Sequence, residues 1–322
     1  MHDPTTWQQI LKTAITSTKQ LSELLSIPHQ NIISDFPLKV PLPFVAKMQQ
    51  KNPKDPLLLQ VLIQSLENLP QPGFSQDPLA EKQYNITDGI IHKYNNRALV
   101  TLAGGCAINC RYCFRRHFDY HKNQTNLATT SQAYQYLKNN QTIKEVILSG
   151  GDPLLQNDNQ LAKIFANLAL IPHIQTVRIH SRLPIVIPAR ITNEFIKVLQ
   201  STRLKSVLVV HCNHPQELAN DTLQAFKTLT QNSIMVFNQS VLLKNINDNS
   251  EVLIALSEKL FQQHVMPYYL HVLDPVQGSQ HFALSLAKTK QLQQELLINL
   301  PGYLVPKIVI DSVGSSYKQA IS

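Results

Sequence analysis

The chain has 322 residues, of which 43% are hydrophobic and 16% charged, with a net charge of +8. This ordinary globular mix excludes wholesale disorder, and no apolar run approaches the ~18 residues of a membrane span. Because the first residues lack the features of a secretion signal, and because lysine and arginine form no basic run, we expect a cytoplasmic protein without a dedicated nucleic-acid surface.

Residues 1–90 are predicted to form an N-terminal helical region. Apolar residues recur at roughly helical spacing in the segments 7–26, 41–50 and 55–66. The proline-rich stretch 69–82 is typical of a connector between structural units.

Residues 91–300 alternate short apolar runs with helical patterns. The predicted strands are 97–103, 144–150, 175–180, 205–211, 233–239 and 265–273. The predicted helices are 130–139, 159–170, 192–200, 215–230, 249–263 and 284–300. Six such units predict a parallel sheet that right-handed crossovers curl toward a barrel. Since a closed barrel needs eight units, we expect an open, partial (β/α)6 barrel, followed by a C-terminal segment 301–322.

A cluster of three cysteines follows the first predicted strand. Cys106, Cys110 and Cys113 form a C-x3-C-x2-C pattern, whereas Cys212 is remote and predicted to be a buried, apolar side chain. Three thiolates can hold a four-iron cluster and leave one iron open to a small molecule. The alternative is a zinc ion, with His117 as its fourth ligand.

Around these cysteines the sequence resembles the radical S-adenosylmethionine (SAM) enzymes, and within them the lysine 2,3-aminomutase family. The resemblance covers about residues 35–322 and is closest to the short branch that makes β-lysine for elongation factor P. It rests on six segments: CAINCRYCFRRHF, SGGDPL, RIHSRLPIVIPARIT, NQSVLL, PYYLHVLDPVQG and HFALS.

The resemblance implies three cofactors: a [4Fe–4S] cluster, SAM and pyridoxal 5′-phosphate. In that chemistry a 5′-deoxyadenosyl radical takes a hydrogen from C3 of L-lysine, and the α-amino group migrates to give β-lysine. It also implies which residues bind SAM: Gly150, Gly151, Asp152, His211 and Gln239. His214 and Arg116 are expected to have structural roles.

The resemblance further assigns the binding of pyridoxal phosphate and of substrate. Lys93 and Arg97 would hold the phosphate, although the long branch has arginine at the position of Lys93. Arg115 would bind the substrate carboxylate. The carboxylates of Asp274 and Asp311 would bind the ε-ammonium group of lysine.

Lys318 is predicted to form the Schiff base with pyridoxal phosphate. It follows Asp311 by seven positions, the spacing of the family. The long branch has a run of glycines before this lysine, whereas this chain has only Gly314. Lys307 is the rival candidate.

The resemblance also implies partners: a reductant protein, and a functional link to elongation factor P and its lysyl-transferring enzyme. Two other functions stay open at this point. One is a radical SAM aminomutase of another specificity, such as glutamate. The other is an RNA-binding or protein-interaction module that is stabilised by a structural zinc ion and has no catalytic activity.

Overall fold

The computed structural model describes residues 6–120 and 122–321, and at its centre is one sheet whose ten strands lie beside one another in chain order. The strands are β1 (Asn85–Thr87), β2 (Ile90–Tyr94), β3 (Arg97–Ala103), β4 (Glu145–Gly150), β5 (Thr176–Ser181), β6 (Lys205–His211), β7 (Met235–Leu242), β8 (Val265–Val272), β9 (Lys307–Ile310) and β10 (Gln319–Ala320). Strands β3 to β9 are parallel to their neighbours in this series. The pairs β1–β2, β2–β3 and β9–β10 are antiparallel.

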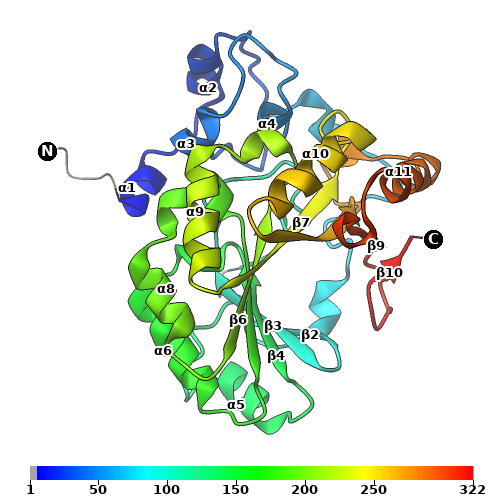
Figure 1. The fold of residues 1–322 in the computed structure, drawn as a ribbon. Helices are drawn as coiled ribbons and strands as arrows, with labels where there is room; N and C mark the ends of the chain where they lie inside the picture. The colour runs from blue at the N-terminus through cyan, green and yellow to red at the C-terminus, as the bar shows by residue number, and fades with distance from the viewer. Residues whose placement is uncertain (1–5, 121, 322) are drawn as a thin grey trace, which may run out of the picture.

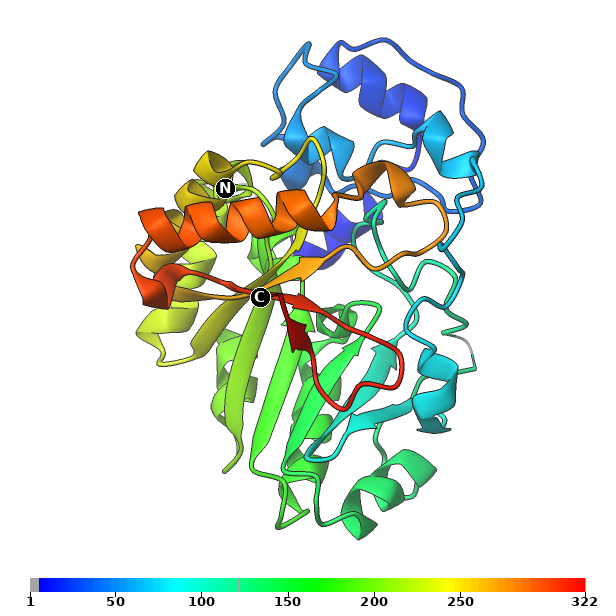
Figure 2. The ribbon, with the colours of Figure 1, turned by 90° about the vertical axis from the view of Figure 1, so that its right-hand side faces the viewer.

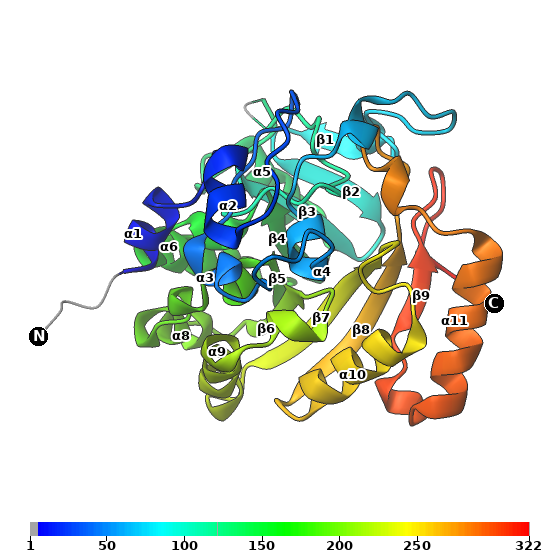
Figure 3. The ribbon, with the colours of Figure 1, turned by 90° about the horizontal axis from the view of Figure 1, so that it is seen from above.

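The six predicted strands are confirmed as β3 to β8, at or near the expected bounds. Seen from above, the sheet curves into an arc with helices on its outer side (Figure 3). Its first and last strands are not paired with each other in the described part of the chain, so the barrel is open, as predicted. Strand β9, in the C-terminal segment, adds a seventh parallel strand that the sequence analysis did not predict.

The hairpin of β1 and β2 was also missing from the prediction. It turns at Asp88-Gly89, where Gly89 has φ +81. An Asp-Gly pair between short strands is a strong hairpin signal, and here the glycine takes the left-handed backbone of the turn. The hairpin brings β2 to the edge of β3 and so carries Lys93 to the open side of the barrel.

Six helices cover the outer face of the parallel strands (Figure 1). They are α5 (Gln132–Asn139), α6 (Asp158–Ala169), α8 (Asn193–Gln200), α9 (Asn220–Gln231), α10 (Ser250–Phe261) and α11 (Leu286–Asn299). A polar side chain caps the first turn of five of them, as Asn157 does for α6 and Ser285 for α11. Apolar residues of their inner faces, such as Phe165 and Phe226, are fully buried against the sheet. The predicted helices of the barrel are thus confirmed.

The N-terminal region is less helical than its sequence pattern predicts. Segment 7–26 forms two helices, α1 (Trp7–Lys12) and α2 (Thr18–Leu25). Between them the backbone of Ile15 exchanges hydrogen bonds of 2.8 and 2.9 Å with Val40, which interrupts the helix. The other two helices are also short: α3 (Leu42–Val45) and α4 (Pro56–Leu59).

This N-terminal region packs over one end of the sheet (Figure 2). The amide of Asn109 donates to the carbonyl of Lys39 at 3.0 Å, and the amide of Arg111 donates to the carbonyl of Gln60 at 2.9 Å. The side chain of Arg111 is fully buried in an ion pair with Glu67. Residues 37–67 therefore hold the cysteine loop from outside the barrel. Across the described ranges, no helix combines the length and apolar character needed to cross a membrane.

Candidate active site

Most of the predicted site residues lie where parallel strands end. Strands β3, β4, β6, β8 and β9 lead into or end with Cys106, Gly150, His211, Asp274 and Asp311, respectively, and Gln239 lies within β7, level with His211. Because these strands are parallel, their carboxyl ends meet along one edge of the sheet. The predicted site residues at these strand ends therefore lie along this edge.

The cysteine loop begins directly after β3. The amide of Cys113 donates to the carbonyl of Cys110 at 3.0 Å, and Lys39 Nζ donates to the carbonyl of Cys106 at 2.9 Å. All three thiols are partly buried. Burial, followed by the nearby Cys113, Asp152 and Cys110, raises the pKa of Cys106. The three thiols lie on one short loop, where the resemblance places the ligands of a shared cluster.

The alternative to a cluster is a zinc ion with His117 as its fourth ligand. A ring nitrogen of His117 lies 3.3 Å from the carbonyl oxygen of Gln277. In residues 6–120 and 122–321, no three His, Cys, Asp or Glu side chains are arranged to hold a single metal ion. A four-iron cluster spreads its thiolates over separate irons, so the donor set fits a cluster better than zinc. Cys212 is fully buried, as predicted, with its thiol 3.5 Å from the carbonyl of His214.

The turn after β4 packs tightly against the cysteine loop. A Cβ added to Gly151 would lie 2.0 Å from the carbonyl oxygen of Gly105, so only glycine fits there. Gly150 has φ +109, and its carbonyl accepts a hydrogen bond of 2.9 Å from Tyr120. These two glycines bring the backbone of the turn against the residue that precedes Cys106.

The side chain of Asp152 is held by partners within the chain. Its buried carboxylate accepts four hydrogen bonds from within the chain, of 2.7 to 3.1 Å. The donors are the amides of Leu154, Arg182 and Leu183 and the hydroxyl of Ser181. The carboxylate therefore ties the turn after β4 to the turn after β5, and the binding of SAM by this turn stays a prediction.

His211 and Gln239 are register partners on β6 and β7, so they lie side by side at the edge of the sheet. His211 Nε2 lies 3.1 Å from the hydroxyl of Tyr112, and the two rings are stacked with centroids 5.7 Å apart. Burial, together with the charge of Arg182, lowers the pKa of His211, so its imidazole is neutral. His214 caps a turn through Nδ1, which accepts from the amide of Gln216, in line with the structural role predicted for it.

A second group of polar residues surrounds Asp311 at the end of β9. Lys93 Nζ lies 2.5 Å from Asp311 Oδ1, and Lys318 Nζ lies 2.6 Å from Oδ2. The hydroxyl of Tyr94 donates to the same carboxylate at 3.1 Å. Burial raises the pKa of Asp311, but the charges and hydrogen bonds of Lys318 and Lys93 outweigh it and lower the pKa.

Lys93, which is a predicted phosphate ligand, has partners within the chain. Its ammonium is bound to Asp311 and, at 2.9 Å, to the carbonyl of Ser312, so it is already paired within the chain. Arg97, the other predicted phosphate ligand, makes a hydrogen bond of 3.2 Å to Asn96. Its guanidinium lies 4.4 Å from the ring centroid of Tyr94.

Lys318 is held beside Asp311 by the short strand that follows it. Gln319 pairs with Ile310, so β10 folds back along β9. The amide side chain of Gln293 donates to the carbonyl of Ile321 at 2.7 Å, which fixes the end of this strand. The rival Lys307 is exposed at the start of β9, away from the edge where the site residues meet.

Asp274 lies in the same region of the barrel. Burial raises its pKa to about 7, while Lys318 and Arg115 act to lower it. The side chain is only partly exposed, and Asp311 and Glu81 also act on it electrostatically. The structure thus brings together the two predicted acids, the predicted Schiff-base lysine and the predicted carboxylate-binding arginine.

Arg115 has an internal partner that the sequence analysis missed. Its Nε and Nη2 donate to the two carboxylate oxygens of Glu81 at 2.7 and 2.6 Å. Its Nη1 has a longer bond of 3.3 Å to the hydroxyl of Ser149. Glu81 lies in the predicted connector, where no local pattern marks it. Arg116 is structural, as predicted, and bonds Glu67 and the carbonyl of Gly278.

Two polar residues on β5 were also missed. Arg178 and His180 alternate with the buried Val177 and Ile179, so they point to the inner side of the barrel. The Nε2 atom of His180 is buried without a partner in the structure. Burial, followed by the charges of Arg178 and Lys318, lowers the pKa of His180. Polar residues at alternate positions of a buried strand were the signal that could have identified them.

Comparisons with known proteins define first a class and then a family. Residues 96–178, which include the cysteine loop, match the family described as "4Fe-4S single cluster domain". The chain is 46% identical over 318 residues to the L-lysine 2,3-aminomutase of Haemophilus influenzae, covering 97% of this chain and 94% of that protein. It is 44% identical to the enzyme of Escherichia coli, covering 97% and 93%. The chain belongs to the L-lysine 2,3-aminomutase family.

Longer members of the family are more distant. The L-lysine 2,3-aminomutase of Acetoanaerobium sticklandii is 34% identical over 282 residues, which cover 86% of this chain but 67% of that protein. This difference in length agrees with the resemblance to the short branch.

Proposed function

We propose that this protein is an L-lysine 2,3-aminomutase, an isomerase that converts L-α-lysine into β-lysine. The observation that carries the proposal is the grouping of Asp274, Asp311, Lys318 and Arg115 at the edge of the sheet that also bears the cysteine loop. A diamino acid presents a carboxylate and a distant ammonium, and this grouping offers a cation for the first and two acids for the second.

The residues present fit the three cofactors of the family. Cys106, Cys110 and Cys113 would hold the cluster, and the backbone of Gly150 and Gly151, with His211 and Gln239, would hold SAM. When bound, the cluster with SAM supplies a carbon radical and pyridoxal phosphate carries the migrating amino group. Arg97 is the proposed phosphate ligand, and it lies near the group of polar residues that surrounds Asp311.

Lys318 is the proposed site of covalent attachment of pyridoxal phosphate. In the structure its ammonium is bound to Asp311 Oδ2 at 2.6 Å. Attachment requires a neutral amine, so the ammonium must give up a proton and leave this carboxylate. Asp311 Oδ2 then keeps the hydrogen bond from Tyr94 and can accept a second one from the ε-ammonium group of the substrate, while Lys93 keeps the other oxygen.

The two acids support lysine over glutamate as substrate. Asp274 and Asp311 would attract an ammonium group and repel a side-chain carboxylate. A charge left unpaired in a buried site costs several kcal/mol, so the discrimination is expected to be large.

The proposed role of the product is the modification of elongation factor P in the cytoplasm. It rests on the resemblance to the short branch of the family, whose Haemophilus and Escherichia relatives match the chain over nearly its whole length. The proposal includes two further partners: a protein that reduces the cluster, and the lysyl-transferring enzyme that uses β-lysine.

The test is anaerobic turnover. The protein is reconstituted with iron, sulfide and pyridoxal phosphate, and then incubated with SAM, a chemical reductant and L-lysine. Appearance of β-lysine, with much slower turnover of L-glutamate and none by the Cys113→Ala variant, supports the proposal. Turnover of glutamate at a comparable rate would replace it with an aminomutase of another specificity. Failure to take up any iron–sulfur cluster would refute the chemistry as a whole.

A further inference from the structure

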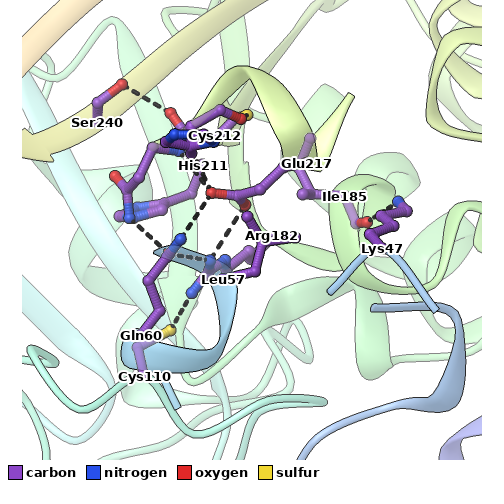
Figure 4. A network of polar contacts seen from close by, with 12 residues as sticks. Lys47, Leu57, Gln60, Cys110, Arg182, Ile185, His211, Cys212, Glu217 and Ser240 are labelled. Carbon is purple, nitrogen blue, oxygen red and sulfur yellow. Dashed lines mark hydrogen bonds and ion pairs between the residues drawn. The ribbon is translucent and has the colours of Figure 1, made fainter. Parts of the chain in front are cut away.

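A buried arginine at the end of β5 touches the cysteine loop. Arg182 is only 7% exposed. Its Nη1 donates to the sulfur of Cys110 at 2.7 Å and to the hydroxyl of Tyr112 at 2.7 Å (Figure 4). Neither the sequence analysis nor the proposed function gives this arginine a role.

The position of Arg182 is fixed from several segments of the chain. Its amide donates to Asp152 Oδ2 at 2.8 Å, which explains why that aspartate is saturated by internal hydrogen bonds. Its Nη2 donates to Gln60 Oε1 at 2.5 Å and to Glu217 Oε2 at 3.1 Å. The guanidinium thus connects the end of helix α4 and the turns after β5 and β6 to the cysteine loop.

Glu217 is the only carboxylate that bonds this guanidinium in the described part of the chain, and it is itself held firmly. Its Oε1 accepts from the amides of Asn213 and His214 at 3.0 and 3.1 Å and from Gln60 Nε2 at 3.0 Å. Its side chain is fully buried. A buried cation therefore lies between a fixed carboxylate on one side and a cysteine sulfur on the other.

We infer that Arg182 tunes the iron–sulfur cluster by donating a charge-assisted hydrogen bond to the Cys110 thiolate and so makes the cluster easier to reduce. The inference rests on the proposed function only in taking Cys110 as a cluster ligand. Reduction adds a negative charge to the cluster, and a cation or hydrogen bond at a ligand sulfur stabilises that added charge. Glu217 opposes the effect, because its negative charge partly neutralises the guanidinium.

The two charges therefore predict shifts of opposite sign. The Arg182→Met variant removes the donor and the cation but keeps a side chain of similar length. At a fixed potential its ratio of reduced to oxidised cluster should fall about tenfold, the effect of roughly one charge-assisted hydrogen bond. The Glu217→Gln variant keeps Arg182 and the shape of the network but removes the opposing charge, so its ratio should rise. Arg182→Lys, which keeps the charge, should lie between the parent and Arg182→Met.

The measurement is a potential titration of the reconstituted proteins without substrate, followed by electron paramagnetic resonance of the reduced cluster, with iron and sulfide contents determined in parallel. A purely structural arginine would lower the cluster content and leave the potential of the remaining clusters unchanged. Equal potentials in the parent and in Arg182→Met would overturn the inference and leave the proposed function standing. Where Arg182→Met takes up no cluster, Glu217→Gln decides, and a potential that does not rise overturns the inference. A parent protein that takes up no cluster overturns both.

Discussion

Arg115 and Glu81 form a buried ion pair in which two guanidinium nitrogens donate to the two oxygens of one carboxylate, at 2.7 and 2.6 Å. Both side chains are about 90% buried, with exposed fractions of 8% and 11%. Burial acts to lower the pKa of Arg115, but the charge of Glu81 outweighs it and raises the pKa. The pair uses one edge of the guanidinium and leaves Nη1, with its single weak bond to Ser149, available to a substrate carboxylate.

The Glu81→Gln variant should therefore bind lysine more weakly. Glutamine can accept one hydrogen bond but cannot neutralise Arg115, so the guanidinium loses its fixed orientation. We expect KM for lysine to rise about tenfold with a smaller change in kcat. This corresponds to a loss of about 1.4 kcal/mol of binding free energy, because the guanidinium is no longer held in position. Steady-state kinetics of the reconstituted protein measures both constants.

The matched control is Asp158→Asn, which breaks the pair of Asp158 with the buried Arg190, at 2.7 Å, on the helical side of the sheet. It should lower thermal stability without raising KM. Equal KM values for the parent and Glu81→Gln would show that Glu81 does not orient the arginine.

The cysteine loop predicts a clear division among the four cysteines. Alanine at Cys106, Cys110 or Cys113 should abolish the bound cluster, because each removes one thiolate ligand. Cys212→Ala should keep the full iron and sulfide content, since this thiol is buried beside the carbonyl of His214. Iron and sulfide analysis after anaerobic reconstitution measures the difference. Loss of the cluster in the Cys212 variant alone would refute the assignment.

Gly151 offers a test that leaves the ligands untouched. In Gly151→Ala the new Cβ would lie 2.0 Å from the carbonyl oxygen of Gly105, a backbone atom that cannot move without shifting Cys106. We expect a marked loss of cluster content and a lower melting temperature. Gly302→Ala is the control, because nothing lies within 4 Å of its added Cβ. If both variants kept a full cluster, the close packing of the two turns would not matter for cluster binding.

The buried carboxyl group of Asp274 predicts a pH-dependent stability of the cofactor-free protein. Burial raises its pKa in the folded state to about 7, whereas the unfolded chain releases this proton near pH ~3.9. Between these pH values the folded state binds more protons than the unfolded state, so this group destabilises the fold increasingly as pH rises, and the penalty is constant above about pH 7.

Asp274→Asn should remove this penalty and stabilise the cofactor-free protein by up to about 4 kcal/mol at pH 8, with a gain that shrinks toward pH 4. Urea unfolding at several pH values measures the gain. The exposed Asp119, changed to Asn, should show no comparable gain. A gain in the free energy of unfolding that is the same at every pH would contradict the assignment to Asp274. When reconstituted, the same variant should turn over lysine poorly but keep its cluster.

Lys318 and Lys307 differ in their surroundings, which predicts where pyridoxal phosphate attaches. Lys318 lies beside Asp311 at the edge of the sheet that bears the site, whereas Lys307 is exposed at the opposite end of β9. After borohydride reduction of the cofactor-loaded protein, peptide mass mapping should find the pyridoxyl group on Lys318. Lys307→Ala should leave this adduct unchanged. An adduct on Lys307, together with full activity of Lys318→Ala, would end the assignment.

The sequence by itself determined the barrel and the cluster loop. The six strands and their helices were predicted at or near their observed bounds, because alternating apolar runs and amphipathic patterns are local properties of the chain. The cysteine spacing is equally local, since all three thiols lie within eight residues. The position of Asp311 and Lys318 on one hairpin also depends on residues only seven apart.

Tertiary structure decided the charge pairs that surround the site. Glu81 meets Arg115 across 34 positions of sequence, and Lys93 meets Asp311 across 218. No periodicity encodes such a pair, because its partners are brought together only when β2 and β9 join the same curved sheet and the connector folds over it. For the same reason the sequence did not predict the internal partners of Lys93 and Asp152. A local pattern specifies which element a residue belongs to, but the packing of distant elements decides which of its charges remain free.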